Sequence, residues 1–399
     1  MSFRTVAAAG AGPLLTTLLR ASRPDEAAVR AFADPERVKR VLVIKLHDQL
    51  GDFLVATPAV RALRRRYPNA RLVLLTREFL RPLAERNRDL DQVVSLPRIE
   101  DAASLARFVQ AVRVTATFRP ELTFVMNSVS RSKSADGFAA LSRAGCVVGR
   151  SRVGDGPVPD AEPLPVLRDP VYDLDVPVAR GSTHQTARLL DLVRWCGADA
   201  GPDLVLELDP SERLVARTRF EELWRACAPV DASPGPAGAR VRWIGIHPGA
   251  ANPLKCWPLD RFVQLGAALV GDAPAAGLER PHEARRLIVF DAPRERGRAA
   301  AVHVGLLARG VRVAFAPAGS IGDFAAACSA LDLLICNDSG VAHIASALRV
   351  PSVSFHALGD PAEWGPQHDR AVTFYAPRAI EALELEPAIS AAERLLASG

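Results

Sequence analysis

RVLVIKL, from Arg40 to Leu46, is the stretch that decides the fold class of this chain. It is a continuous apolar run that closes on the polar stretch HDQLGD (47–52), as expected of a strand buried on both faces of a parallel sheet. Apolar residues then recur at helical spacing in PAVRALRRRYP (58–68), where Pro58 suits the first turn of a helix. Strand, loop and helix in this order predict the start of a doubly wound α/β domain.

The same alternation continues along the chain. In the first half it predicts strands at 71–76, 92–96, 121–126 and 146–149, with helices at 102–117, 134–144 and 184–196. In the second half it predicts strands at 241–249, 286–291, 311–316, 331–337 and 351–355, with helices at 259–270, 295–309, 322–330 and from 379. A loop excursion rich in Pro and Asp, residues 150–180, interrupts the first series.

These patterns predict an α/β protein with two doubly wound Rossmann-like domains that face each other across a ligand cleft. The Pro- and Gly-rich stretch 228–240 is the clearest linker. We therefore divide the chain into the following segments: a helical N-terminal extension (1–38), a first domain (39–227), the linker (228–240), a second domain (241–378) and a C-terminal helix (379–399).

Composition limits the classes of function. Hydrophobic residues make up 49% and charged residues 24% of the 399 residues, the balance of a globular protein with a large core. No apolar run reaches the roughly 18 residues that span a bilayer, and the apolar N-terminus is interrupted and lacks a cleavage site. The net charge of +5 is well mixed, so nucleic acid is not expected as a partner. The mild positive bias suits an anionic nucleotide substrate and leaves open a peripheral contact with the inner membrane surface.

The cysteines and the missing motifs narrow the choice further. Six scattered cysteines without a CxxC pair favour buried thiols in a reducing cytoplasm over a zinc or iron site. A dinucleotide-binding GxGxxG, a Walker A motif, an HExxH and a G-x-S-x-G elbow are absent from the sequence. Asp89-Leu90-Asp91 and Asp173-Leu174-Asp175 match a DxD metal motif, which we attribute to chance. We expect no metal and no other cofactor.

Asp52 is the first candidate for chemistry. It closes the loop after the first predicted strand, where side chains point toward a ligand site, and Gly51 lets the backbone approach a ligand closely. The alternative is that Asp52 only caps the following turn. Spacing alone does not separate the two interpretations.

Lys255 is the second candidate. It lies in HPGAANPLKCWP (247–258), the loop after the first strand of the second half. Only four of the chain's 50 Lys and Arg residues are Lys, so a Lys in a glycine-containing loop suggests a specific ammonium. Such a point charge suits a diphosphate, although a surface Lys beside a packed Trp257 would look the same.

The third candidate stretch is LICNDSGVAHIA (334–345), in which a strand ends in a turn that opens a helix. The free amides and the positive dipole end of that helix form an anion site. Asp338, Ser339 and Gly340 form the turn, and His343 follows in the first turn of the helix. An ordinary capped helix with a structural His is the alternative.

Taken together, the three stretches resemble glycosyltransferase family 9, the heptosyltransferases, over roughly residues 40–380. The resemblance implies a GT-B fold, in which the first domain binds the acceptor and the second binds the nucleotide sugar. It implies an inverting, metal-independent transfer of a sugar, typically heptose from ADP-heptose, to a hydroxyl of a glycan or glycolipid such as lipopolysaccharide core. Asp52 would be the base, and Lys255 with residues 338–340 would hold the diphosphate.

The resemblance also suggests further contacts and has departures. Gly249, Ala250, Glu295 and His343 would complete the donor site, and Asn127, Arg131 and Lys133, with Ser128, would meet the acceptor. Many relatives carry hydroxyl residues where this chain has Ala250 and Ala251, and His356 stands where a small glycine is usual. His184 could face the same site or serve packing.

Two rivals remain on this reading. A nucleotide-sugar epimerase of similar build would need other acids and bases around the sugar. A non-catalytic, sugar-nucleotide-binding scaffold would have no need for Asp52 or Lys255, although the hydroxyl-poor donor loop fits it. We expect a cytoplasmic enzyme.

Overall fold

The computed structural model describes residues 24–151, 164–165, 169, 171–179, 181–227, 240–271, 283–293, 295 and 297–398. The chain forms two compact units, Met1–Val205 and Leu206–Gly399. Most of the predicted N-terminal extension lies outside the described residues. Its described part contains the short helix α2 (Glu26–Ala31), whose first turn is capped by the Asp25 carboxylate.

The first unit is built on a sheet with strand order β3-β2-β1-β4-β5-β7-β6. All neighbours pair in parallel except β6 and β7, which are antiparallel. The strands are β1 (Arg40–Lys45), β2 (Arg71–Arg77), β3 (Gln92–Leu96), β4 (Leu122–Val125), β5 (Cys146–Gly149), β6 (Leu164–Pro165) and β7 (Leu174–Asp175). The order 3-2-1-4-5 is that of a Rossmann-like domain, so the prediction for this half is confirmed.

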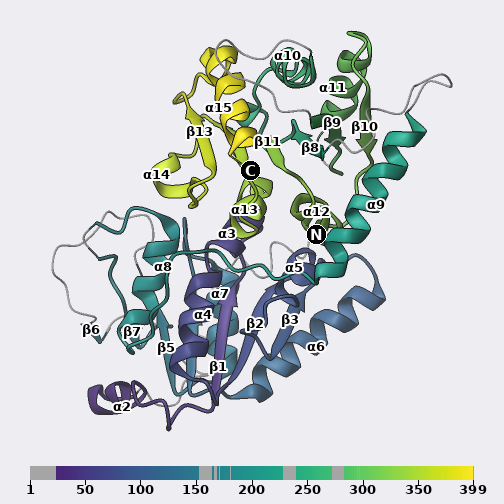
Figure 1. Ribbon diagram of the computed structural model, residues 1–399. Coiled ribbons are helices and arrows are strands. Elements are labelled where there is room, and N and C mark those ends of the chain that lie inside the picture. Colours follow the sequence, from purple (N-terminus) through teal and green to yellow (C-terminus); the bar gives the residue numbers. More distant parts are fainter. Residues whose placement is uncertain are drawn as a thin grey trace, which may run out of the picture. The chain divides into compact units, whose positions relative to one another are not determined.

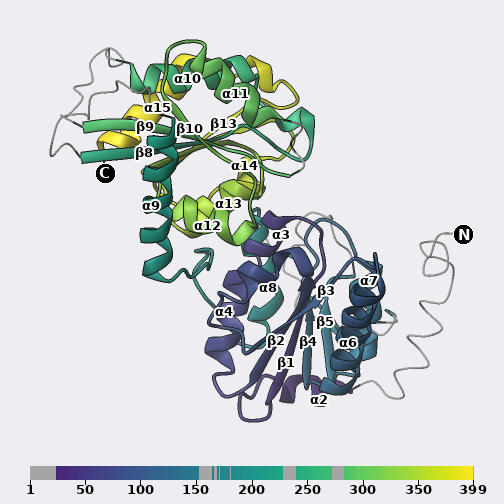
Figure 2. The same cartoon turned by 90° about the vertical axis from the view of Figure 1, so that its right-hand side faces the viewer.

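Helices cover both faces of this sheet (Figure 2). α4 packs with α8 on one face and α6 with α7 on the other, which buries the apolar strands between two layers. The helices are α3 (Leu50–Leu54), α4 (Thr57–Arg66), η1 (Glu78–Leu80), α5 (Arg81–Ala84), α6 (Ala102–Phe118), α7 (Lys133–Ser142) and α8 (Gln185–Arg194).

The second unit repeats the plan with strand order β10-β9-β8-β11-β12-β13, all parallel (Figure 1). The strands are β8 (Arg240–His247), β9 (Glu283–Phe290), β10 (Val313–Ala316), β11 (Leu333–Asn337), β12 (Ser352–His356) and β13 (Ala371–Tyr375). β8 and β11 are neighbours at the point where the strand order reverses, which is where doubly wound folds bind ligands.

Its helices are α9 (Pro210–Ala226), η2 (Pro253–Lys255), α10 (Leu259–Val270), α11 (Arg298–Leu307), α12 (Ile321–Ser329), α13 (Gly340–Ala347), α14 (Pro361–Trp364), η3 (Ile380–Ala382) and α15 (Leu385–Ala397). α10, α11 and α15 cover one face of the sheet, and α12 and α13 the other (Figure 2). Trp257 stacks on Phe355 with ring centroids 3.9 Å apart and anchors the loop after β8 in the core.

The structure moves the division between the halves toward the N-terminus. Sequence reasoning placed residues 206–227 in the first domain and the linker at 228–240, whereas α9 belongs to the second unit. Phe220 of α9 packs on Trp243 and Phe290 of the second sheet, and Glu221 pairs with Arg286 at 2.6 Å. A buried aromatic contact outweighs the Pro- and Gly-rich composition that suggested the boundary. Residues 228–239 lie outside the described residues.

Candidate functional site

Asp52 lies at the carboxyl end of the first sheet, on a short helix. Sequence reasoning placed it in a loop, but α3 begins at Leu50, so Asp52 is in the first helical turn. Gln49 is the N-cap residue, and no side chain makes a capping hydrogen bond there. The capping interpretation of Asp52 is therefore wrong, because its carboxylate is directed to other partners.

Those partners are Lys45 and Ser128, which meet Asp52 in a buried cluster. Lys45, the last residue of β1, lies with its Nζ atom 3.6 Å from Asp52 Oδ1 and donates a hydrogen bond of 2.8 Å to Ser128 Oγ. Ser128 in turn donates to Asp52 Oδ1. A hydroxyl thus joins the ammonium to the carboxylate, and all three side chains are almost inaccessible to solvent.

The pKa values of two residues in and beside this cluster are lowered. Burial lowers the pKa of Lys45 to about 8, although the charge of Asp52 and the hydrogen bond with it oppose the change. Burial and the nearby Lys45 also lower the pKa of His47, whose Nε2 lies 3.0 Å from the Ser130 carbonyl oxygen. The lowered pKa values favour the neutral forms of the Lys45 and His47 side chains, and shifted pKa values of this kind are common at functional sites.

The predicted acceptor residues lie in the segment after β4, in different surroundings. The Arg131 guanidinium is held by Asp136 at 2.7 Å and by Asp169 at 2.5 Å and 3.0 Å, and it lies over the Tyr172 ring. Asn127 donates to the Tyr172 hydroxyl at 3.1 Å. Arg131 and Asn127 thus connect elements of the first unit, whereas Lys133 is exposed at the start of α7. His184 is the N-cap of α8, where its Nδ1 accepts from the Thr186 amide.

In the second unit, the loop after β8 is shaped by Glu295. A Cβ atom at Gly249 would lie 1.6 Å from Glu295 Oε2, so the Glu295 carboxyl occupies the space that a side chain at position 249 would fill. Burial and Asp291 raise the pKa of Glu295 to about 7, and burial lowers the pKa of His247 to about 4. The Glu295 and His247 side chains, whose Oε1 and Nε2 atoms are 3.5 Å apart, are therefore both neutral between about pH 4 and pH 7. Among the described residues, Glu295 Oε2 has no hydrogen-bond partner.

Two residues that sequence reasoning missed hold this loop in place. Asn337, at the end of β11, accepts from the Trp257 amide at 2.9 Å and donates to the Pro248 carbonyl at 2.8 Å. Arg298, at the start of α11, donates to the Pro248 and Trp257 carbonyls, both at 3.0 Å. Asn337 stood in a motif already singled out, but its partners lie about 80 residues away in the sequence.

Lys255 and Asp338 meet at the N-terminus of α13. Their Nζ and Oδ2 atoms are 2.7 Å apart, which joins two motifs that the sequence showed separately. Ser339 is the N-cap of α13, yet its hydroxyl makes no capping bond and has no partner among the described residues. Gly340 begins the helix, and His343 follows one turn later and is buried. An ammonium beside free helix amides is an arrangement that binds anions.

His356 is buried at the end of β12, beside the same carboxylate. Its Nδ1 is 3.8 Å from Asp338 Oδ1, and its Nε2 lies 3.0 Å from Ser354 Oγ. Burial lowers its pKa, Asp338 opposes that change, and Lys255 adds to it. The residue therefore belongs to the cluster around Asp338.

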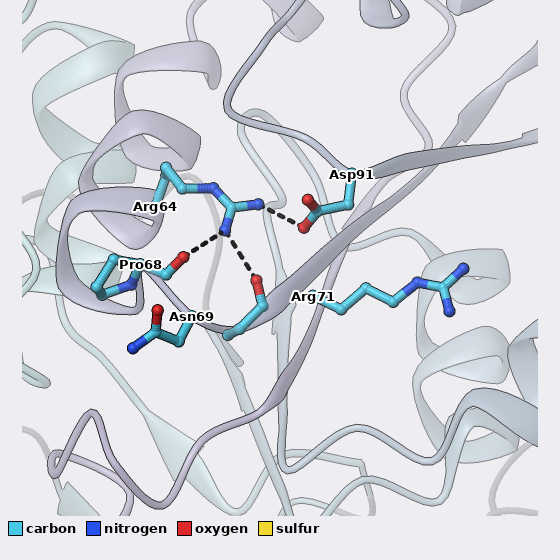
Figure 3. A pocket seen from close by; sticks show the side chains of 6 residues that line it. Arg64, Pro68, Asn69, Arg71 and Asp91 are labelled. Carbon is cyan, nitrogen blue, oxygen red and sulfur yellow. Dashed lines mark hydrogen bonds and ion pairs between the residues drawn. The ribbon is translucent and has the colours of Figure 1, made fainter.

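The carboxylates of the two DxD matches have other partners, and Asp91, one of them, borders a surface hollow. Arg64 donates to Pro68, Ala70 and Asp91 around a hollow of about 330 Å³ at the start of β2, the sheet edge opposite Asp52 (Figure 3). Asp89 pairs with Arg61, while Asp173 and Asp175 accept hydrogen bonds from backbone amides of the first unit. These carboxylates have local structural partners, as expected of chance matches.

Comparison with known proteins follows the same division into units. Residues 200–384 match the family model described as glycosyltransferase family 9 (heptosyltransferase), which begins close to the start of the second unit. A Haemophilus influenzae protein named putative glycosyltransferase is 22% identical over 350 residues, 86% of this chain and 91% of that protein. The match over residues 200–384 bears out the predicted resemblance to glycosyltransferase family 9, and with it the prediction of a transferase.

Solved structures agree on the fold. A glycosyl transferase family 9 protein from Veillonella parvula has a TM-score of 0.69 and 20% identity, over 90% of this chain and 98% of its own. The ADP-heptose lps heptosyltransferase II of E. coli has a TM-score of 0.62 and 17% identity, over 90% and 99%. The E. coli heptosyltransferase WaaC, solved with ADP, has a TM-score of 0.62 and 17% identity, over 89% and 99%. The predicted GT-B fold is confirmed.

The described part of the chain contains no helix that combines the length and apolar character needed to cross a bilayer.

Proposed function

Because this chain is a glycosyltransferase of family 9 by the domain in its residues 200–384, we propose that it transfers heptose from ADP-heptose to a hydroxyl of a glycan or glycolipid, such as lipopolysaccharide core. The transfer inverts the anomeric centre and needs no metal. Lys255 beside the N-terminus of α13 is the observation that carries this proposal, since it forms a site for the donor's diphosphate.

The diphosphate site rests on charge and on free donors. The Lys255 ammonium, with 27% of its side chain exposed, can reach an incoming anion. The amides of the first two residues of α13 have no carbonyl partner earlier in the helix, whereas the Ala342 amide donates to the Ser339 carbonyl. The Ser339 hydroxyl is a further donor. Together these groups offset the negative charge that grows on the leaving diphosphate, the task that a divalent metal performs in other transferases.

Glu295 supports a nucleoside site next to the diphosphate. Its Oε2 has no partner among the described residues and lies against Gly249, where a ligand hydroxyl such as that of ribose can donate to it. Ala250 contributes only backbone groups there, and His343 lies on the same helix as the anion site. The E. coli heptosyltransferase WaaC has been solved with ADP and with ADP-2-deoxy-2-fluoro heptose, which supports ADP-heptose as the donor.

Asp52 is the base in this proposal. As the acceptor hydroxyl attacks the anomeric carbon, the bond from that carbon to the diphosphate oxygen breaks and the hydroxyl proton passes to the Asp52 carboxylate. Lys45 and Ser128 orient the carboxylate through Oδ1, which leaves Oδ2 for the proton. Lys133 is the exposed cation proposed for the acceptor. Arg131 and Asn127 would act there by shaping the loop, given their partners.

The test is nucleotide release from ADP-heptose and from GDP- and UDP-sugars, measured with and without a lipopolysaccharide-core acceptor and with EDTA. The proposal expects ADP release that depends on the acceptor, persists in EDTA and yields the inverted glycoside by NMR. Donor binding without turnover for any acceptor would favour the non-catalytic scaffold instead. Loss of turnover in EDTA, restored by a divalent cation, would rule out the metal-independent mechanism.

A further inference from the structure

Asp338 lies between two groups that can carry positive charge. Lys255 Nζ is 2.7 Å from its Oδ2 atom, and His356 Nδ1 is 3.8 Å from its Oδ1 atom. The carboxylate is 7% exposed and the imidazole 1%, so Lys255 is the most accessible member of the cluster. Gly359 also lies against the Asp338 carboxylate, because a Cβ atom at this position would be 2.9 Å from Asp338 Oδ2.

A diphosphate and Asp338 therefore compete for one ammonium. If the proposed function is correct, the donor draws Lys255 toward its phosphates and away from Asp338. A buried carboxylate that loses its counter-charge is strongly destabilised. Donor binding thus needs a second positive charge close to Asp338.

His356 is placed to supply that charge. Its Nδ1 has no hydrogen-bond partner among the described residues, and its Nε2 is near the Ser354 hydroxyl. The charged groups that shift its pKa are Asp338, directly after β11, which raises it, and Lys255 on η2, which lowers it. The residue facing it on β13 is Tyr375, by strand register. Because burial also lowers its pKa, His356 is mainly neutral while Lys255 holds Asp338.

We propose that His356 is a positioning residue that takes up one proton when the nucleoside diphosphate sugar binds. The protonated imidazole then replaces Lys255 as the charge partner of Asp338, and Lys255 stays on the diphosphate. The proton comes from solvent to Nδ1 and returns to solvent when the nucleotide product leaves. Donor affinity therefore falls as pH rises, by up to about tenfold per pH unit.

The first test needs no donor. Lys255→Met removes the ammonium from Asp338, so histidine-labelled NMR should show His356 titrating at least about one pH unit higher than in the wild type. The His356 signal is the one missing from the spectrum of His356→Gln. An unchanged titration of His356 in Lys255→Met would overturn the proposal.

The second test measures proton uptake on donor binding. Calorimetry of ADP-heptose is run in two buffers of different ionisation enthalpy at about pH 6, 7 and 8. The wild type should take up more protons than His356→Gln, which should also lose part of the pH dependence of donor affinity. His303→Gln, a histidine on α11 outside the site, is the control and should match the wild type.

The other groups with pKa values shifted near neutrality, Glu295 and Lys45, are present in all three proteins and cancel in the comparison. If another nucleotide sugar binds in place of ADP-heptose, the proposed donor is wrong, and the same comparison is made with that sugar. Equal proton uptake by the wild type and His356→Gln refutes the role of His356 but leaves the transferase intact. If no nucleotide sugar binds the wild type, the proposed function fails, and the NMR titration alone decides the pairing.

Discussion

Each unit contains a lysine–aspartate pair at the carboxyl edge of its sheet, and the two pairs differ in access and in geometry. Lys45 and Asp52 are 1% and 2% exposed, lie 3.6 Å apart and share the Ser128 hydroxyl. Lys255 and Asp338 are in direct contact at 2.7 Å, and the lysine remains partly exposed. We expect the same two residue types to act as a fixed support in the first unit and, by the proposal above, as an exchangeable contact in the second.

The largest effect is expected on kcat when Asp52, the proposed base, is replaced. Asp52→Asn cannot accept a proton, so kcat should fall by about 10²–10⁴-fold while donor affinity stays the same. Steady-state kinetics and donor titration separate the two quantities. Asp48 lies just before α3, and its exposed carboxylate pairs with Arg77 at the end of β2, so Asp48→Asn should keep wild-type turnover. Full activity of Asp52→Asn would eliminate Asp52 as the base.

Lys45→Met tests whether the first pair is a support. It leaves the Asp52 carboxylate buried without its counter-charge, so the free energy of unfolding should fall by about 3–5 kcal/mol. Urea unfolding measures this loss, and adding Asp52→Asn to the variant should restore most of it. If the double variant is no more stable than Lys45→Met, the two charges are not coupled.

Lys255→Met tests the exchangeable pair. Loss of an electrostatic group at the leaving diphosphate should lower kcat by about 10²–10³-fold and weaken donor binding. Its effect on the unfolding free energy should be smaller than that of Lys45→Met, because solvent reaches the Lys255 ammonium. Lys39→Met changes an exposed lysine that pairs with Glu36, and it should leave donor binding and kcat unaltered. Unchanged kinetics in Lys255→Met would remove the residue from the site.

The smallest expected effect is a pH dependence in the second unit. The pKa of Glu295 is raised to about 7, so the folded protein binds more protons than the unfolded chain between the unfolded pKa and pH 7. This group therefore lowers stability as pH rises through that window. Glu295→Gln stays neutral, so its melting temperature relative to the wild type should increase from about pH 5 to pH 8. The lowered pKa of His247 is common to both proteins. If the melting temperatures of the two proteins changed with pH in the same way, the raised pKa of Glu295 would be contradicted.

Sequence patterns predicted the elements that depend on neighbours along the chain. Continuous apolar runs marked β1 and β8 to within two residues, because strands buried on both faces need apolar side chains throughout. Short polar motifs at the strand ends located Asp52, Lys255 and Asp338. The domain boundary was less predictable. The Pro- and Gly-rich composition of residues 228–240 suggested a linker there, whereas the packing of Phe220 on Trp243 places α9 in the second unit.

By itself, the sequence determined the α/β class, the two series of strands and the residue types near the strand ends, since these follow from local periodicity and turn chemistry. Only the tertiary structure decided which of those residues meet. Ser128 lies 76 residues from Asp52, and Asn337 binds a loop 80 residues away, so no local spacing reveals either contact. Whether Asp52 lies in a loop or a helix, and whether a lysine is sealed or exposed, likewise depends on burial, which is set by the packing of distant segments.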